Sequence, residues 1–547
     1  MTALRDRAVA GSRRAGPTAA EPAGRGPPGA DRYLPRPPTR TEKYSYLGAR
    51  RPYVFAWLLI AAMGILYGYV RVATKAWWTM PALLLLVVMV PPVVINFWLR
   101  IGRPRLTLAR HRAIISSYTY GHEAIDVFLP SCGEPVELLD NTMRCASAVR
   151  WLGPKTVYVL DDSAREEVRA LAARYGFRYV VRANRGEMRK AGNLINAFGI
   201  SDGEFIMVLD ADFAVRPDFL YETMPYTADP KVGVVQTAQF FDTRNRSFPY
   251  IQRYAGTLQD IFFRFIQPAR DRYRAAICAG TNLVYRRSAV EAAGGFATVP
   301  IGEDVHSGVK LGWAGYEVRY VPLCLAKGVA PADFASLANQ QNRWCRSSMM
   351  LMVDKHFREA RYSWQQRVAY WAAFLYYMSS AALLFTGPFP TLTMMWFFPR
   401  LVFPYNYLVI LPSFAATLFA FPLLSRGWRP TIYRVCVINS CCHLYALWYS
   451  VRGRIAEWVP TGASRGQDPV PLAVGRILRT WIVTVQGLLW ASLVLRIDEF
   501  GWRPYWATLV LTAYQLFMLA PLMTCMRERH PAASPAAAAA PPAREAA

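Results

Sequence analysis

Long apolar stretches occur near both ends of the chain, and a more polar region lies between them. The first two run from Tyr53 to Val70 and from Trp77 to Leu99, and Pro91-Pro92 interrupts the second. Each approaches the roughly 20 residues that cross a hydrocarbon core. Further apolar stretches lie at 368–385, 402–424, 477–495 and 505–525. The pattern predicts about six membrane-spanning helices, two before the polar region and four after it.

A shorter apolar run, Val435 to Tyr449, lies between arginines on both sides. Basic residues beside a short apolar helix are typical of helices that lie in the plane of the membrane surface. We therefore expect an interfacial helix here rather than a further span.

In the polar region, short β-branched runs alternate with helical patterns. The runs have the composition of buried strands of a parallel sheet. Alternating strands and helices predict a doubly wound α/β domain. The expected strands are Val127–Leu129, Thr156–Leu160, Tyr179–Val181 and Phe205–Leu209, and the expected helices are Pro135–Leu152, Ala164–Tyr175 and Lys190–Phe198.

Both ends of the chain differ in composition from the rest. Residues 1–50 are rich in Arg, Pro and Gly, and residues 527–547 are rich in Ala and Pro, so we expect disordered tails. The N-terminal charged segment is too long for a cleaved signal peptide. The predicted organisation is a tail at 1–50, two membrane helices at 51–100, a cytosolic domain at 101–365, four membrane helices with the interfacial helix at 366–526, and a tail at 527–547.

Charge narrows the possible partners. The 547 residues include 63 Lys and Arg against 37 Asp and Glu, a net charge of +26, which suits nucleic acid, an anionic membrane or a phosphorylated substrate. Arginine is spread over the N-terminal tail and the flanks of apolar segments instead of one DNA-binding element. This favours positive-inside membrane anchoring, with the tails and the α/β domain in the cytoplasm and no nucleic-acid partner. The nine cysteines contain no C-x-x-C pair, so we expect reduced thiols without a metal.

Acidic residues follow two of the predicted strands. Asp161 and Asp162 follow the strand at 156–160, and Asp210 and Asp212 follow the strand at 205–209. Ligands of open α/β sheets bind beyond the carboxyl ends of the strands. Two carboxylates at alternate positions suit Mg²⁺ or Mn²⁺ together with substrate phosphates. For Asp161-Asp162, a helix N-cap is an alternative interpretation.

A basic segment, Arg185 to Asn193, opens a predicted helix. Cations and free backbone N–H groups at a helix start suit a pyrophosphate. A solvated basic turn is the alternative.

Two later motifs have the chemistry for sugar transfer. Asp304, in Gly302-Glu303-Asp304, is a candidate general base, because a carboxylate in a water-poor pocket can have its pKa raised toward that task. Gln340, Arg343 and Trp344 share one helix face and offer an amide, a cation and an aromatic platform for a sugar ring. Taken singly, the first motif is also explained as a surface acidic pair and the second as an interfacial anchor.

In this order, from about Ile125 to Met352, the motifs resemble those of the processive family-2 glycosyltransferases. Among these they are closest to the cellulose synthase-like enzymes of the bacterial catalytic-subunit type. The resemblance implies an α/β GT-A (Rossmann-like) cytosolic domain inserted between membrane helices. It also implies direct displacement with inversion on a UDP-sugar, Mg²⁺ or Mn²⁺ as cofactor, and a polymer that passes through the helices of the enzyme.

The resemblance also implies roles for individual residues. Asp304 is the implied base, with Glu303 beside it, and the implied metal ligands are Asp210 and Asp212. The segment Val235–Phe241 is implied on the acceptor side. The implied nucleotide-sugar ligands are Pro130, Glu134, Asp161, Asp162, Lys190, Asp210, Gln340 and Arg343, and the implied acceptor ligands are Gly280, Thr281, Asn282, Gln340 and Trp344.

The chain departs from the family pattern at three places. The usual T-E-D motif is Gly302-Glu303-Asp304, without the threonine. The gating loop has a loose counterpart in Trp458–Gly462. We expect no PilZ-type cyclic-di-GMP domain after the last span.

The expected function is polymerisation of a β-glycan, first of all a cellulose-like β-1,4-glucan from UDP-glucose, with its transfer across the plasma membrane by a multi-pass protein. Expected partners are the UDP-sugar, the growing polysaccharide, the lipid membrane and cell-envelope proteins. One alternative is a non-processive transferase that acts on a lipid carrier. Another is a transporter with a cytosolic regulatory domain, which predicts intramembrane charges and related halves, whereas the sequence shows no internal repeat.

Overall fold

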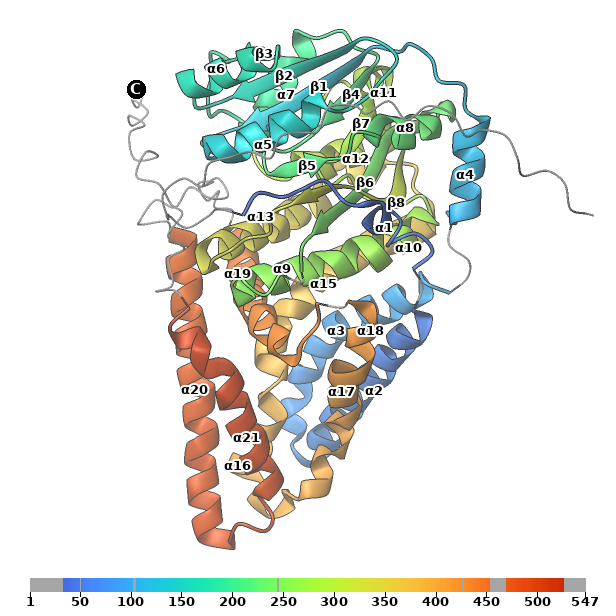
Figure 1. The fold of residues 1–547 in the computed structure, drawn as a ribbon. Helices are drawn as coiled ribbons and strands as arrows, with labels where there is room; N and C mark the ends of the chain where they lie inside the picture. Colours follow the sequence, from blue (N-terminus) through green and yellow to red (C-terminus); the bar gives the residue numbers. More distant parts are fainter. Residues whose placement is uncertain are drawn as a thin grey trace, which may run out of the picture. The chain divides into compact units, whose positions relative to one another are not determined.

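The computed structural model describes residues 33–49, 51–101, 105–243, 245–425, 427–452 and 469–525 (Figure 1). Eight strands in this part of the chain form one sheet, in the order β3-β2-β1-β4-β7-β6-β8-β5. The strands are β1 (Ile125–Ser131), β2 (Lys155–Asp161), β3 (Arg178–Val180), β4 (Phe205–Val208), β5 (Phe213–Val215), β6 (Val232–Phe241), β7 (Leu283–Arg286) and β8 (Glu317–Gly328).

The sheet has a parallel half and a mixed half. Strands β3, β2, β1 and β4 are parallel neighbours, which confirms the four predicted strands. Strand β7 is antiparallel to both β4 and β6, β6 is parallel to β8, and β5 is antiparallel to β8. The expectation of a parallel sheet therefore holds only for the first half, because the later strands are not joined by regular strand–helix–strand crossovers.

Helices cover the sheet, and apolar residues on both of its faces form the core. On β1, Val127 and Leu129 belong to one core cluster and Phe128 belongs to the other, as expected from alternating side chains in a strand. Helix α5 ends earlier than predicted, at Ser147. The helices of this part are α4 (Leu108–Ser117), α5 (Val136–Ser147), α6 (Glu166–Arg174), α7 (Arg189–Gly199), α8 (Phe219–Thr223), α9 (Tyr250–Ile261), α10 (Gln267–Asp271), α11 (Arg287–Ala292), α12 (Glu303–Trp313), α13 (Phe334–Val353) and α14 (Lys355–Glu359).

The segment 34–49, which composition assigns to a disordered tail, is folded. It contains the short helix α1 (Arg40–Lys43), and its Lys43 is buried in ion pairs with Asp218, at 2.7 Å, and with Glu222. The buried Tyr46 hydroxyl donates to Asp260. A few specific contacts with the sheet domain order this segment, although its average composition is that of a disordered chain.

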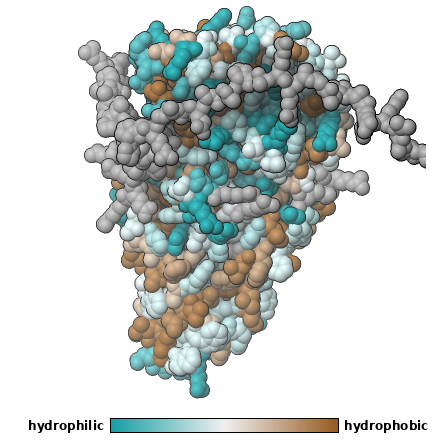
Figure 2. Space-filling model, in the orientation of Figure 1, coloured by the Kyte–Doolittle hydropathy of each residue, from teal (hydrophilic) through white to brown (hydrophobic). Residues whose placement is uncertain are grey.

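Four helices among the described residues are long and apolar enough to cross a membrane: Pro52–Lys75, Trp364–Phe397, Pro469–Phe500 and Trp506–Met523. They contain α2 (Pro52–Lys75), α15 (Trp364–Thr386), α16 (Phe389–Phe397), α20 (Pro469–Phe500) and α21 (Trp506–Leu519). On the face drawn in Figure 2, hydrophobic residues gather over the apolar helices and hydrophilic residues over the sheet domain. These helices agree with the predicted stretches at 53–70, 368–385, 477–495 and 505–525.

The predicted spans at 77–99 and 402–424 differ from the structure in their details. Helix α3 (Met80–Trp98) continues through Pro91 and Pro92, where an interruption was expected. The stretch 402–424 is a series of short pieces, η5 (Pro404–Ile410), α17 (Leu411–Ala415), η6 (Ala416–Ala420) and α18 (Phe421–Leu424). Prolines inside this stretch remove helix hydrogen bonds and favour such breaks. The count of six spans stays a prediction.

Helix α19 (Tyr433–Val451) is longer than the predicted interfacial helix and packs against α13 and α15. Its interfacial position stays a prediction.

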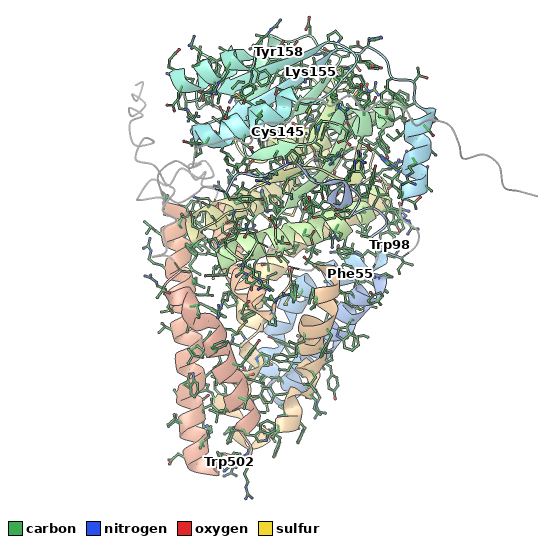
Figure 3. The ribbon with its side chains drawn as sticks, in the orientation of Figure 1. Phe55, Trp98, Cys145, Lys155, Tyr158 and Trp502 are labelled. Carbon is green, nitrogen blue, oxygen red and sulfur yellow. The ribbon has the colours of Figure 1, made fainter. Side chains whose placement is uncertain are left out.

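Aromatic stacking joins the apolar helices to the sheet domain: Trp98, labelled in Figure 3, stacks with Tyr273 at 5.0 Å and with Trp364 at 5.2 Å between ring centroids. Through these contacts the end of α3 and the start of α15 are fixed beside Tyr273, the second residue after α10.

Candidate active site

The carboxylate of Asp161 holds the turn at the end of β2. It is buried, and it accepts hydrogen bonds from the backbone N–H groups of Ser163, at 3.1 Å, and Arg165, at 2.9 Å. The hydroxyl groups of Ser131 and Tyr179 donate to it as well. The Asp161 carboxylate thus closes the turn between β2 and α6 (Glu166–Arg174), but the N-cap of α6 is Arg165, so the N-cap interpretation is wrong. A contact between Asp161 and a nucleotide stays a prediction.

Asp162 is bound by an arginine. The guanidinium of Arg182 donates to both carboxylate oxygens at 2.7 Å, and both side chains are almost completely buried. Arg182 also donates to the backbone carbonyl of Arg189, at 3.1 Å, where helix α7 begins. A bidentate pair of this kind fixes its two partners firmly. The Asp162 carboxylate, expected to bind the nucleotide sugar, therefore connects strand β2 to the start of α7.

The loop that follows β1 brings Glu134 to the same edge of the sheet. The backbone N–H of Cys132 donates to the Glu134 carboxylate at 2.6 Å, and Arg165 donates to the Glu134 backbone carbonyl at 2.6 Å. Burial raises the pKa of Glu134. Pro130 lies inside β1, buried and paired in register with Leu160, so it shapes this loop from within the sheet.

Lys190, in the first turn of α7, brings three distant segments together. Its ammonium donates to a carboxylate oxygen of Asp210 and, at 2.8 Å, to the backbone carbonyl of Gly280. It also lies 3.9 Å from the Glu303 carboxylate. Burial would lower the pKa of Lys190, but the negative charges of Asp210 and Glu303 outweigh burial and raise it. The side chain is therefore a fixed cation at the centre of an acidic cluster.

Asp210 and Asp212 follow β4 directly. The backbone N–H of Asp210 donates to the Thr281 hydroxyl at 2.8 Å. Burial and the negative charges of Asp210 and Glu134 raise the pKa of Asp212 to about 7. Lys190 offsets only part of this negative charge, and a further cation would stabilise such a group of carboxylates. Among the described residues, no group of three or more His, Cys, Asp or Glu side chains is arranged to hold a metal ion, so a cation here would depend on two carboxylates and on ligands from a substrate.

Hydrogen bonds from strand β6 hold the segment 278–282 in place. The Gln236 side chain donates to the Thr281 carbonyl at 2.8 Å and accepts from the Ala279 backbone N–H at 2.7 Å. Thr281 and Asn282, expected to bind the acceptor, are almost completely buried. They support Asp210 and β6 in this structure, and their contact with an acceptor stays a prediction.

Asp304 lies in the first turn of α12, next to this loop. Gly280 approaches it so closely that a Cβ atom at position 280 would lie 2.8 Å from a carboxylate oxygen of Asp304. Burial, together with the negative charge of Glu303, raises the pKa of Asp304 to about 7. A carboxylate with this pKa has the properties expected of a general base near neutral pH.

Helix α13 carries the Q-x-x-R-W residues. Arg343 is close to the acidic cluster: burial lowers its pKa, and the negative charges of Glu303, Asp210 and Asp304 oppose that effect. The side-chain oxygen of Gln340 is buried without a hydrogen-bond partner. Trp344 is 37% exposed. The structure thus brings Arg343 to the predicted site, with an unsatisfied amide one turn before it.

The arginine that binds Asp162 was not predicted from the sequence. Arg182 follows the predicted strand Tyr179–Val181, and a basic residue beside an acidic pair at neighbouring strand ends was the available signal. Gln236 lies in the segment Val235–Phe241, which was expected on the acceptor side, but its support of the segment 278–282 was not predicted, because these partners are distant in sequence. The loose gating-loop counterpart Trp458–Gly462 lies outside the described residues.

Comparisons with known proteins found one matching family and several curated relatives. Residues 205–420 match the family described as Glycosyl transferase family group 2. Cellulose synthase 2 of Novacetimonas hansenii is 32% identical over 263 residues, which are 46% of this chain and 16% of that protein. The UDP-forming cellulose synthase catalytic subunit of Pseudomonas fluorescens is 30% identical over 258 residues, 46% of this chain and 35% of that protein.

The matched region thus spans about a third or less of these curated relatives. Among solved structures, the mannosyltransferase PcManGT from Pyrobaculum calidifontis, in complex with GDP-Man and Mn²⁺, aligns with a TM-score of 0.48 and 15% identity over 72% of this chain and 100% of that one. The chain contains a domain of glycosyltransferase family 2, and its curated relatives over this region are named as cellulose synthases.

Proposed function

We propose that the chain is a membrane-embedded inverting glycosyltransferase that polymerises a β-glycan from a UDP-sugar, with β-1,4-glucan from UDP-glucose as the expected product. One observation carries this proposal: Lys190, Asp210 and Asp304 meet around Gly280. A cation for a diphosphate and a carboxylate base lie on two sides of one glycine. The resemblance of the ordered motifs and the cellulose synthase relatives support the polymer as product.

The proposed reaction is a single displacement. An acceptor hydroxyl oxygen attacks the anomeric carbon of the donor sugar, and the bond from that carbon to the diphosphate oxygen breaks. The hydroxyl proton moves to the Asp304 carboxylate, whose pKa of about 7 suits this transfer. Lys190 and Arg343 stabilise the negative charge that develops on the leaving diphosphate. The sugar is inverted, and no covalent enzyme intermediate forms.

A divalent cation, Mg²⁺ or Mn²⁺, belongs to this proposal. The carboxylates of Asp210 and Asp212 would hold it, and the raised pKa of Asp212 fits a site that lacks one positive charge. Hard cations of this kind use one or two carboxylates together with substrate phosphates. When bound, the cation would neutralise charge on the diphosphate. Around it, Lys190 contacts Asp210 from α7 and keeps that carboxylate in place.

Buried polar atoms without partners support a path for the polymer. Among the described residues, seven such atoms lie on α13, α16, α19 and α20, and α13 packs against both α19 and α20. Unsatisfied buried polar groups are costly and need an explanation. A hydroxyl-rich chain that passes between these helices would satisfy them. The atoms are Gln340 Oε1, Asn342 Nδ2, Trp396 Nε1, Asn439 Oδ1, His443 Nδ1, Gln486 Oε1 and Trp490 Nε1.

The proposed location is the plasma membrane, with several spans and a cytoplasmic catalytic domain. Four apolar helices and the spread of arginine along the flanks of the apolar segments support it. The proposed partners are the UDP-sugar, the growing polysaccharide, the surrounding lipid and proteins of the cell envelope.

The test offers radiolabelled UDP-glucose, UDP-N-acetylglucosamine and GDP-mannose to membranes that contain the protein, and then digests any product with linkage-specific glycosidases. We expect a long polymer from UDP-glucose that a β-1,4-glucanase degrades. A lipid carrying one sugar would show the non-processive transferase instead. Substrate flux by reconstituted protein without cleavage of any nucleotide sugar would show the transporter.

A further inference from the structure

Helix α12, which carries the proposed base Asp304, contacts α13 at a residue that has no room for a side chain. Residue 302, the N-cap of α12, is a glycine with φ of 69°. A Cβ atom on this residue would lie 1.8 Å from Oγ and 2.5 Å from Cβ of Ser347. Real Cβ atoms do not approach other atoms this closely. The Ser347 side chain therefore occupies the space that a side chain at position 302 would need.

A second contact holds the same two helices together. His306, one turn further along α12, is hydrogen-bonded through its ring to the backbone carbonyl of Ser347 at 3.3 Å. Both residues are buried. Ser347 thus contacts α12 through its side chain and through its backbone, at two successive turns of α12.

The consequence concerns the two charged residues beside this contact. Asp304 is two residues after Gly302, and Arg343 is one turn before Ser347 on α13, on the same helix face. The position of Ser347 against Gly302 thus sets how far the proposed base lies from the cation of α13. On its other side, Asp304 is bounded by Gly280, where a Cβ atom would also collide.

We infer that Gly302 and Ser347 form a steric pair that sets the position of the base Asp304 relative to Arg343. Ser347 is then a positioning residue, and it acts through its volume and not through its hydroxyl group. The pair also gives a physical reason why this chain has a glycine where the family pattern has a threonine. The Ser347 side chain fills the space that a threonine side chain at position 302 would occupy. This inference rests on the proposed function, because it assigns Asp304 as the base.

The experiment measures how far Gly302→Ala lowers UDP-glucose turnover when residue 347 is serine, alanine or glycine. With Ser347 present, UDP-glucose turnover is expected to fall on the order of a hundred-fold, since displacement of a reacting group by about 1 Å has effects of this size. In the Ser347→Ala background, Gly302→Ala should lower turnover by a similar factor, because the Cβ atom of residue 347 remains. In the Ser347→Gly background, Gly302→Ala should lower turnover by less than about threefold. Equal costs in the Ser347 and Ser347→Gly backgrounds would overturn the inference.

Gly176→Ala is the matched backbone control. Gly176 has the same φ of 69°, but no heavy atom lies within 4 Å of the position of its Cβ, so this variant has the same backbone strain without the collision. We expect its turnover to stay within about threefold of wild type. A loss in Gly176→Ala as large as that in Gly302→Ala would mean that backbone strain alone explains the effect.

Binding of UDP, measured by calorimetry, separates positioning from misfolding. Gly302→Ala should bind UDP within about threefold of wild type while turnover falls, because the nucleotide groups lie on other elements. A parallel loss of both would overturn the inference. If Gly302→Ala does not fold, the Gly302→Ala/Ser347→Gly variant decides, and it must fold and turn over. If wild-type protein turns over no sugar, the proposed function has failed, and the melting temperatures of the same variants still test the steric pair.

Discussion

At the scale of single residues, charge and burial decide what each carboxylate can do. Asp161 and Asp162 are occupied by hydrogen bonds within the protein. Asp212 and Asp304 are half-buried near other negative charges, and desolvation together with these charges raises the pKa of each to about 7. The first two therefore hold the sheet edge together, and for the last two the roles of metal ligand and general base stay predictions.

Replacement of Asp304 by Asn should separate binding from transfer. The amide cannot accept the acceptor proton, so we expect turnover to fall by about 10²- to 10⁴-fold. UDP binding should change by less than about threefold, because the proposed nucleotide ligands lie on other elements. Steady-state kinetics with UDP-glucose and calorimetry with UDP measure the two effects. Wild-type turnover by the variant would remove Asp304 as the base.

The raised pKa of Asp304 predicts the pH dependence of the reaction. A base acts only when deprotonated, so turnover at saturating donor should rise with pH through about 7 and level off above about 8. Below about pH 6 it should fall close to tenfold per pH unit. The residual turnover of Asp304→Asn should lack this limb. A wild-type profile that is flat between pH 5 and 8 would contradict the assignment.

The raised pKa of Asp212 links stability to pH and to the cation. Because the folded-state pKa lies above the ordinary value of 3.8, the contribution of Asp212 to stability is lost as pH rises through about 7. At pH 8 with a chelator, Asp212→Asn should melt roughly 2–4 °C higher than wild type. Added Mg²⁺ or Mn²⁺ should raise the melting temperature of wild type and leave that of the variant unchanged.

In the same way, Asp212→Ala should weaken the metal-dependent part of UDP binding, measured by calorimetry with and without a chelator. Turnover by wild type that is independent of any divalent cation would contradict the metal assignment.

At the scale of elements, the start of α7 depends on its attachment to β2. Met188 and Arg189 have φ of 50° and 51°, a left-handed conformation that non-glycine residues adopt only when neighbouring contacts hold them. The Arg182 contacts to Asp162 and to the Arg189 carbonyl are such contacts. They place Lys190, the next residue, at the acidic cluster.

Arg182→Lys tests this attachment. A lysine keeps the charge but not the two parallel hydrogen bonds to Asp162, so we expect a loss of about 1–3 kcal/mol in the free energy of unfolding. UDP binding should weaken as well, since Lys190 loses its fixed position. Arg178→Lys is the control, because Arg178 is exposed and donates only to the Tyr158 hydroxyl. Equal effects of the two substitutions would show that the attachment has no special role.

At the scale of the whole molecule, the sheet domain and the apolar helices share helix α13. Its Gln340 and Arg343 belong to the candidate site, and its buried face packs on α19, where His443 is hydrogen-bonded to Gln341 at 3.2 Å. The site for transfer and the proposed path for the product are thus built from one helix. This arrangement gives a physical reason for joining the two parts in one chain.

Asn439→Leu tests the proposed path. The Asn439 side-chain oxygen on α19 is buried without a partner, so removal of the polar group should leave the protein equally stable or more stable. Product length should fall, because a polar contact along the path is lost. UDP binding should stay the same. Melting curves and size analysis of the labelled product measure these effects, and an unchanged polymer length would argue against a path along α19.

Patterns within short segments were sufficient to predict much of the fold. The four parallel strands, the helices α6 and α7 and the four long apolar helices follow from periodicity and length, which depend on neighbours in sequence. The prediction failed where distant partners decide. Segment 34–49 is ordered by Asp218, Glu222 and Asp260, and the mixed half of the sheet depends on how β6, β7 and β8 pair.

The sequence by itself determined the order of the motifs, their strand-end and helix positions, and the membrane-length helices, because burial patterns and strand-end residues can be recognised locally. Only the tertiary structure decided that Lys190 meets Asp210 and Gly280, that Arg182 occupies Asp162, and that Ser347 fills the space beside Gly302. These contacts join residues from separate elements. Their geometry depends on how the sheet and the helices pack together, which no spacing along the chain determines.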